Sequence, residues 1–258
     1  MKHKTLYAGY GCSFLAFIVL RICQLGFTIE SNTGFYKPQY ENFWYISAAV
    51  IILSVAAITF FSFTDVDFNS RKKEGGLTAT FCIITGVGFL IKAISSFSEN
   101  FGAVPALLTL FAVVSAMACF INAYCIFGGK SGKTGWYTLM VPFWIIELVF
   151  VFVQNNDVSS VPHRFYEIVT AALGLVFAVC LAKDRAGMFS GISSKIMVAL
   201  SLTASLFCLA FSLPNMVLFL AGKGSLLHDA SFSDALYLSY GLFITVYIFS
   251  TFKLKKAS

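Results

Sequence analysis

The chain has 258 residues, of which 58% are hydrophobic and 12% are charged, and its formal net charge is +6. Soluble domains are about 45–50% apolar and about 25% charged, so this composition excludes an ordinary soluble globule. The positive charge does not indicate nucleic-acid binding, because Lys and Arg occur in short clusters between apolar runs. We therefore expect an all-α integral membrane protein, with residues 1–258 in one helical domain and the lipid bilayer as its main partner.

The start of the chain has two interpretations, a secretory leader or a retained helix. Lys2 and Lys4 precede an apolar run, as they do in a leader. The run contains Arg21, however, and no small-residue cleavage site follows it. We therefore expect a retained first membrane helix.

The hydropathy pattern predicts a bundle of about eight transmembrane helices. A helix needs about 20 mainly apolar residues to cross the hydrocarbon core of a bilayer, and no segment between the apolar runs is long enough for a separate soluble domain. The predicted spans are Leu6–Phe27, Phe43–Thr64, Leu77–Phe97, Ala103–Phe127, Trp136–Val153, Phe165–Ala182, Ile196–Ala221 and Ala235–Phe252.

The charges between the spans predict the orientation of the bundle. Basic residues are retained on the cytoplasmic side of a membrane, and basic-rich and basic-poor segments alternate at every predicted crossing. This alternation places both termini in the cytoplasm (N-in/C-in). No N-x-S/T glycosylation acceptor occurs, which agrees with a bacterial inner (plasma) membrane. The basic-rich segments hold Lys2, Lys4, Arg71, Lys72, Lys73, Lys130, Lys133, Lys183, Arg185, Lys195, Lys253, Lys255 and Lys256, and the opposite segments hold Lys37, Arg164 and Lys223 with Glu30, Glu41, Glu99, Asp157, Asp229 and Asp234.

The sequence offers little metal, redox or covalent chemistry. All seven cysteines lie inside apolar runs, and no C-x-x-C pair or His/Cys cluster occurs. No Ser/His/Asp arrangement or pair of carboxylates suggests a catalytic site. We therefore expect no catalytic residue, no metal, no cofactor and no disulfide framework.

Four charged residues lie inside predicted spans and form the candidate substrate-binding site: Arg21, Lys92, Glu147 and Glu167. A charge in hydrocarbon costs roughly 2.5–3.5 kcal/mol on insertion scales, so each should face protein or water. All four fall in the outer half of their spans, and together they can bind a small charged or zwitterionic solute. The alternatives are structural ion pairs or side chains that snorkel to the interface. Glu147 lies deepest and is the strongest single candidate.

Three further polar residues are secondary candidates: His163, His228 and Asp229. His163 and Glu167 are one helical turn apart and share a face, which suits a proton-linked pair or half of a metal site. No other His lies nearby in the sequence, so an interfacial polar pair is the simpler interpretation. His228 and Asp229 are neighbours in the last outer loop.

Prolines and glycines inside the spans predict local features of the helices. Pro142 and Pro214 each free a backbone carbonyl, which predicts a kink or an opening at a binding site. Gly86 and Gly88 in the third span predict close packing against neighbouring helices.

The outer end of the first span reads LRICQLGFTI and is followed by ESNTGFY, residues Glu30–Tyr36. This stretch resembles small, uncharacterised polytopic bacterial membrane proteins that have an Arg-bearing first helix and a Thr-Gly-Phe-aromatic outer loop. The resemblance implies the same eight-helix architecture and no particular activity. Gly34 permits a turn in this loop, and Phe35 and Tyr36 can fold back as a plug or an anchor.

These features lead to one functional hypothesis and two rivals. The hypothesis is a membrane protein without enzymatic activity that binds or transports a small-molecule solute through the four intramembrane charges. The first rival is an interaction or sensory subunit that docks a membrane-protein partner through its basic loops, and its polar cluster should be fully paired and dry. The second rival is an intramembrane lipid-modifying enzyme that uses His163, Glu167 and Asp229.

Overall fold

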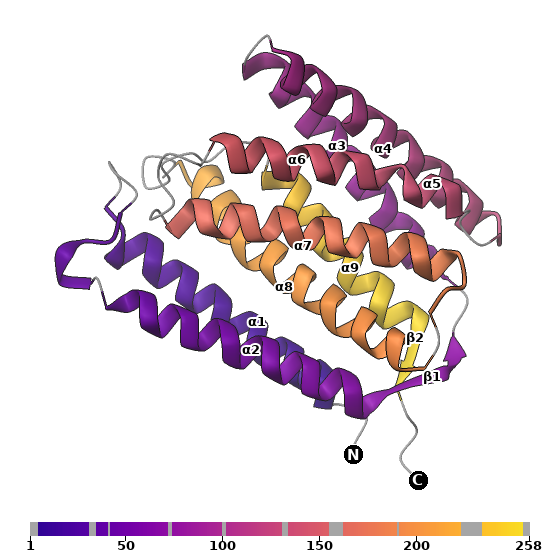
Figure 1. The fold of residues 1–258 in the computed structure, drawn as a ribbon, viewed down its shortest axis with the longest axis horizontal. Coiled ribbons are helices and arrows are strands. Elements are labelled where there is room, and N and C mark those ends of the chain that lie inside the picture. The colour runs from indigo at the N-terminus through magenta and orange to yellow at the C-terminus, as the bar shows by residue number, and fades with distance from the viewer. Residues whose placement is uncertain are drawn as a thin grey trace.

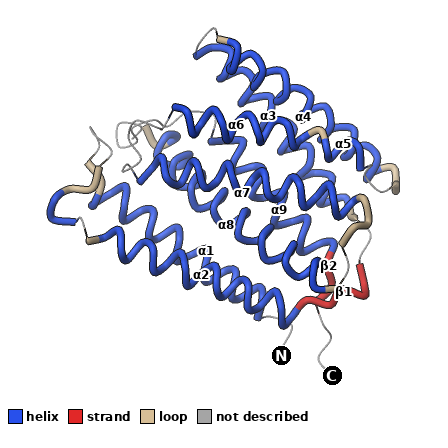
Figure 2. Tube along the Cα trace, viewed as in Figure 1, coloured by secondary structure: helices blue, strands red, loops and turns tan. Residues whose placement is uncertain are grey.

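The computed structural model shows a helical bundle (Figure 1). It describes residues 5–30, 35–40, 42–71, 74–99, 102–130, 134–154, 162–189, 191–222 and 234–254. Two short strands join the helices at one end of the bundle (Figure 2). The elements are α1 (Thr5–Cys23), the π-helical turn η2 (Gln24–Thr28), the 3-10 turn η3 (Pro38–Tyr40), α2 (Phe43–Asp65), β1 (Val66–Arg71), α3 (Gly76–Glu99), α4 (Ala103–Phe127), α5 (Thr134–Thr138), α6 (Met140–Gln154), α7 (Pro162–Arg185), α8 (Ile192–Leu220), α9 (Asp234–Thr251) and β2 (Phe252–Leu254).

Seven helical segments of the described chain are long and apolar enough to cross a membrane, which confirms a multi-pass membrane protein. They match seven of the eight predicted spans in order. The eighth predicted span is α9, a helix of 18 residues that lies outside this set. Tyr, Ser and Thr interrupt its apolar residues, because α9 faces other helices along most of its length. The count of eight crossings stays a prediction.

Six helices of the described chain form a closed ring of neighbours, in the order α3, α4, α6, α7, α8 and α9. The α1–α2 hairpin packs against α8 from outside this ring, so α8 lies between the hairpin and the other helices. Figure 1 shows this hairpin along one side and the α3–α4 pair along the other. Inside the ring, Trp144 packs on Tyr240 with ring centroids 4.6 Å apart, and Phe89 and Phe177 complete an aromatic core.

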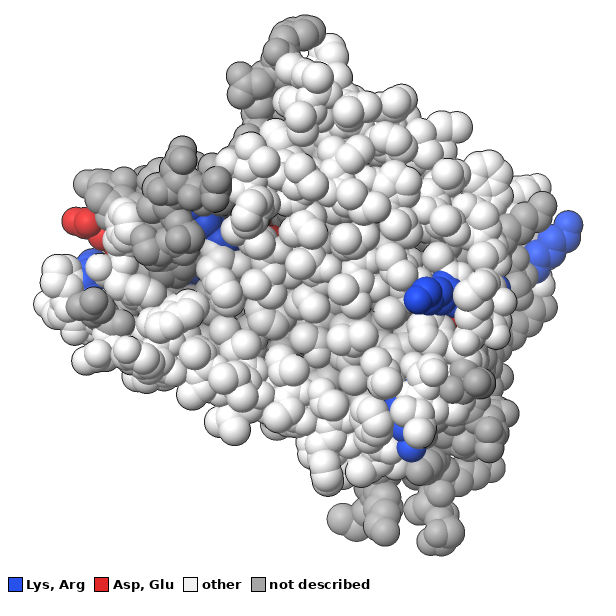
Figure 3. All heavy atoms as spheres, in the orientation of Figure 1, with Lys and Arg blue, Asp and Glu red and all other residues white. Residues whose placement is uncertain are grey.

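The outer surface of the bundle is suited to lipid. Large apolar side chains stand exposed on several helices, for example Leu53 at 69% and Ile94 at 71%. On the face drawn in Figure 3, charged atoms lie toward the two ends of the molecule and the broad middle is uncharged. Hydrocarbon is the solvent that accepts such a band without penalty.

The predicted fifth span is broken into α5 and α6 at Leu139. Pro142 explains the break, because proline has no N–H for the carbonyl four residues earlier and its ring collides with that carbonyl. That residue is Thr138, the last residue of α5. The kink that the sequence predicted at Pro142 therefore lies at the start of α6.

Two short strands follow the second and the eighth predicted spans. β1 follows α2 directly and pairs antiparallel with β2, with Val66 opposite Leu254. The last span ends at Thr251, and Phe252 begins β2. The strands were missed because each is short and its partner is distant in sequence. Tyr7 also contacts Phe249, so the first helix begins at the end of the bundle where α9 finishes.

Candidate functional site

A group of polar side chains lies in the bundle near the end opposite the strands. All four intramembrane charges predicted from the sequence belong to it. Lys92 lies seven residues before the end of α3, about 10 Å at 1.5 Å per residue, so the group lies well inside the bundle. We call the following seven residues the polar cluster: Arg21 of α1, Lys92 of α3, Glu147 of α6, Glu167 of α7, Asn215 of α8, and Asp234 and Tyr237 of α9.

Lys92 and Glu147 form a buried ion pair at the centre of the polar cluster. Lys92 Nζ lies 2.8 Å from Glu147 Oε1, and the two side chains are 8% and 0% exposed. Tyr237 donates a hydrogen bond from its hydroxyl to the same oxygen, also at 2.8 Å. One carboxylate oxygen of Glu147 therefore receives both a charged and a neutral donor.

Arg21 is buried rather than snorkelled. Its side chain is 1% exposed, and its guanidinium lies over the rings of Tyr166, at 4.9 Å, and Phe211, at 5.8 Å. Its Nη1 donates to Gln24 Oε1 at 3.4 Å. A planar guanidinium is weakly hydrated and stacks on aromatic faces, which makes arginine the basic residue best suited to such a site.

Gln24 connects Arg21 to the loop that follows the first helix. Its Nε2 lies within hydrogen-bond distance of three hydroxyls: those of Tyr36 and Ser47 at 3.0 Å and that of Tyr166 at 3.4 Å. Tyr36 therefore folds back toward the bundle, as the sequence suggested. Burial raises the pKa of the Tyr36 hydroxyl, which keeps it protonated.

The return of Tyr36 depends on local backbone structure. At the end of α1 the helix widens into η2, and the Ile29 N–H donates to the Gln24 carbonyl at 2.9 Å. Ile29 and Tyr36 then form an antiparallel bridge. Single π-helical turns occur often at functional sites. Gln24 and Ser47 were missed from the sequence because uncharged polar residues inside apolar runs are common.

Asp234 joins the polar cluster, although the sequence placed it in an outer loop. It is the first residue of α9 and 5% exposed. Asn215 Nδ2 donates to Asp234 Oδ2 at 3.1 Å. Asp234 lies near enough to Glu167, Lys92 and Arg21 to interact with them electrostatically, and Tyr237 interacts in the same way with Glu147 and Glu167. The structure thus brings all four predicted charges together around α9. Of the four predicted charges, Glu167 is half-buried and the other three are buried.

The secondary candidates His163, His228 and Asp229 contribute little to this picture. The backbone of His163 lies in the first turn of α7, but its side chain lies outside the described part of the structure. His228 and Asp229 lie outside the described residues as well. Across the described chain, no group of three or more His, Cys, Asp or Glu side chains can hold a metal ion.

Two buried oxygens of the polar cluster have no hydrogen-bond partner among the residues that the structure describes. They are Oε2 of Glu147 and Oδ1 of Asn215, and both side chains are fully buried. Buried polar atoms are nearly always paired with protein or water. Three carboxylates and two basic groups also meet here, so the cluster as described can accept a proton or a positively charged group.

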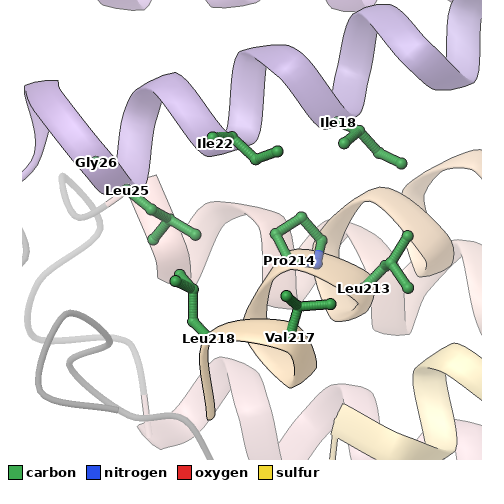
Figure 4. Close-up of a pocket in the computed structure, with 8 residues that line it drawn as sticks. All are labelled: Ile18, Ile22, Leu25, Gly26, Leu213, Pro214, Val217 and Leu218. Carbon is green, nitrogen blue, oxygen red and sulfur yellow. The ribbon is translucent and has the colours of Figure 1, made fainter. Parts of the chain in front are cut away.

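An apolar groove lies beside the polar cluster, between the end of α1 and α8 (Figure 4). Its volume is 260 Å³. Leu25 and Gly26 of η2 line it from one side and Pro214 of α8 lines it from the other, so two helix irregularities meet at the groove. The eight residues that line it are Ile18, Ile22, Leu25, Gly26, Leu213, Pro214, Val217 and Leu218.

A second ion pair lies at the end of the bundle that holds the strands. Arg185 of α7 pairs with Glu74, which precedes α3. The Arg185 guanidinium lies over Tyr137 at 5.3 Å and over Tyr247 at 5.0 Å. This pair is separate from the polar cluster.

Comparisons with known proteins match no family model, no curated sequence and no solved structure. The resemblance of the ESNTGFY stretch therefore stays an expectation. Any functional inference has to come from the geometry of this chain.

Proposed function

We propose that this chain is a membrane protein that binds a small charged or zwitterionic solute in the polar cluster and transports it across the membrane. The observation that carries the proposal is the meeting of both charge signs with two buried oxygens that have no partner among the described residues. A purely structural ion pair needs no additional acceptors. Charges retained within membrane spans face functional cavities or pathways by default.

The helices around the cluster support a transport role. Solute sites of transporters lie near interrupted helices, whose freed backbone groups can bind ligand. Here α1 ends in the π-helical turn η2, and Pro214 interrupts the hydrogen-bond ladder of α8 next to Asn215. Both irregularities lie within a turn of the polar cluster, which lets these segments rearrange around a solute without melting a whole helix.

The orientation that we propose places the cluster toward the outside of a bacterial inner membrane. The described basic residues near the opposite end are Arg71, Lys130, Lys183, Arg185, Lys195 and Lys253. Positive residues favour the cytoplasmic side. With both termini on that side, the polar cluster lies in the outer half of the bilayer and is reached first by an external solute.

The proposal is tested by thermal denaturation of the purified protein with a panel of small solutes: glycine betaine, choline, ethanolamine, alanine, lysine and glutamate. A solute at about 100 times its Kd stabilises the folded state by about 2.7 kcal/mol, which raises the Tm by several degrees. We expect at least one panel member to stabilise the wild type and to have no effect on Glu147→Gln.

Glu74→Gln is the matched control for this substitution. It neutralises the carboxylate of the Glu74–Arg185 ion pair, at the other end of the bundle. We expect it to keep the response to the solute while its basal Tm falls. Equal stabilisation of wild type and Glu147→Gln, or no stabilisation of the wild type by any panel member, would overturn the proposal.

An interaction or sensory subunit is the second candidate function, and the Lys92–Glu147 pair favours it. This pair is closed, short and nearly inaccessible, as expected for charges that hold helices together. Co-purification of a stoichiometric membrane partner that protects the basic loops from proteolysis would support this role.

A further inference from the structure

We propose that the solute carries a single apolar chain, which lies in the groove between α1 and α8 while its zwitterionic head occupies the polar cluster. This inference rests on the proposed function and narrows the solute to a single-chain amphiphile, of which lysophosphatidylethanolamine is a suitable probe. The groove supplies the apolar half of the site, and the buried charges supply the polar half.

The groove is open to the surrounding lipid. Ile22 and Val217 line it and are 52% and 56% exposed. All eight lining residues are apolar or glycine, so nothing in the groove binds a head group. Its 260 Å³ is below the range of about 300–1,000 Å³ of drug-sized sites, which suits one chain better than a bulky ring system.

The groove and the polar cluster share the same helical turns. Residues three or four apart on a helix are neighbours on its surface. Leu25 of the groove therefore lies one turn from Arg21, and Leu218 of the groove lies one turn from Asn215. A chain in the groove therefore lies within one helical turn of both polar residues, whose side chains are buried beside it.

The charges of the cluster match a head with both signs. Arg21 belongs to the same helical segment as the lining residues Ile18 and Ile22. It suits a phosphate, because a guanidinium binds phosphate through two parallel hydrogen bonds. Asp234 suits the ammonium group, and the unpartnered Oδ1 of Asn215 can accept one of its protons.

Gly26 provides a direct way to fill the groove. A Cβ added at Gly26 meets no atom within 4 Å, and Gly26 lines the groove, so we expect the side chain of Gly26→Leu to narrow the groove without displacing the backbone. Gly11 is the matched control, because it also lies on the first helical segment and is equally open, but does not line the groove.

The experiment is photo-crosslinking in phosphatidylcholine nanodiscs, with crosslinked peptides located by mass spectrometry. The probe is lysophosphatidylethanolamine with a diazirine in its acyl chain, and the companion probe is a monoacylglycerol with the same chain. We expect the first probe to label segments 18–26 and 213–218 in the wild type and in Gly11→Leu. Labelling should fall several-fold in Gly26→Leu.

The two probes separate head-group recognition from simple partitioning into the groove. Asp234→Asn should weaken labelling by the zwitterionic probe and leave the monoacylglycerol unchanged. Uniform labelling of all lipid-facing helices, or labelling that is insensitive to Gly26→Leu, overturns this inference. If Glu147→Gln still abolishes stabilisation by a chainless solute in that case, the proposed function stands and only the amphiphile is wrong.

Discussion

The Lys92–Glu147 ion pair lies where a single unpaired charge would be most costly. Neither residue alone is compatible with the apolar interior, because an ion without a partner keeps its full desolvation penalty. Tyr237 adds a hydrogen bond to the carboxylate, and Arg21 is stabilised by aromatic rings rather than by water. At the scale of single residues, the polar cluster is an arrangement in which each charge depends on a particular neighbour.

Removal of one partner of this pair should destabilise the protein more than removal of both. Lys92→Met leaves the Glu147 carboxylate buried without its cation, and breaking a buried pair in this way costs about 3–5 kcal/mol. The double variant Lys92→Met with Glu147→Gln should recover most of that loss, because no buried charge is left unpaired. The measurement is reversible unfolding of the purified protein in mixed micelles.

Lys130→Met serves as the control for this series, because Lys130 is exposed at the end of the turn after α4. We expect its free energy of unfolding to change by less than about 0.5 kcal/mol. A double variant that is less stable than Lys92→Met alone would show that the two residues do not act as a pair.

Helix contacts in this protein depend on small residues at specific crossings. The prediction from Gly86 and Gly88 was close packing, and a Cβ at Gly88 would collide with Ser239 Oγ of α9. Gly86 instead faces Phe120 of α4. A glycine also permits close helix packing at Gly174 of α7, where the Trp144 ring of α6 approaches the backbone.

Gly174→Ala is expected to destabilise the bundle. An added Cβ would lie 2.6 Å from a ring carbon of Trp144, and that ring is fully buried against Tyr240 and Phe89. The ring has to shift, and overpacking of this kind costs about 1–3 kcal/mol. The change should appear as a lower Tm and as altered tryptophan fluorescence.

Gly11→Ala is the comparison for the glycine effect alone. It adds a methyl group into open space on α1, where alanine is the better helix former by about 1 kcal/mol. Its Tm should stay level or rise. An equal loss of stability in both variants would point to a general cost of replacing glycine rather than to the crossing of α6 and α7.

At the scale of the whole molecule, the face drawn in Figure 3 has an uncharged band between two charged ends, and the strands connect the ends of α2 and α9. The pairing of β1 with β2 holds the end of α9 to the α1–α2 hairpin. Both the start of α1 and the end of α9 lie at this end. The eight crossings predicted from the sequence would produce that arrangement.

Fusion reporters test the orientation of the whole bundle. We expect green fluorescent protein fused after Ser258 to be fluorescent in a bacterial host, and alkaline phosphatase fused after Gly129 to be inactive, because both positions are cytoplasmic in the proposed topology. Alkaline phosphatase fused after Gln154 should be active. The reversed pattern would place the polar cluster in the inner half of the membrane.

The positions of most helices could be predicted from the sequence. The fourth span, Ala103–Phe127, coincides with α4 at both ends, because helix length in a membrane is set by bilayer thickness and by where apolar residues stop. The four candidate charges were also found in this way, since a charge inside an apolar run is visible without a structure. These are local properties of the chain.

Asp234, Asn215 and the Gln24–Tyr36 contact could not be predicted in the same way. Whether Asp234 ends a loop or begins a buried helix depends on which helices surround it. The hydropathy of the sequence around Asp234 is similar in both cases, so it does not distinguish them. Gln24 acquires its role only because η2 turns Tyr36 back toward it. The sequence by itself determined a multi-pass helical membrane protein with rare charges inside its spans, because the cost of charge in hydrocarbon applies to each residue separately. Only the tertiary structure decided that those charges meet around α9 beside an apolar groove, because neighbours are chosen by the packing of whole helices.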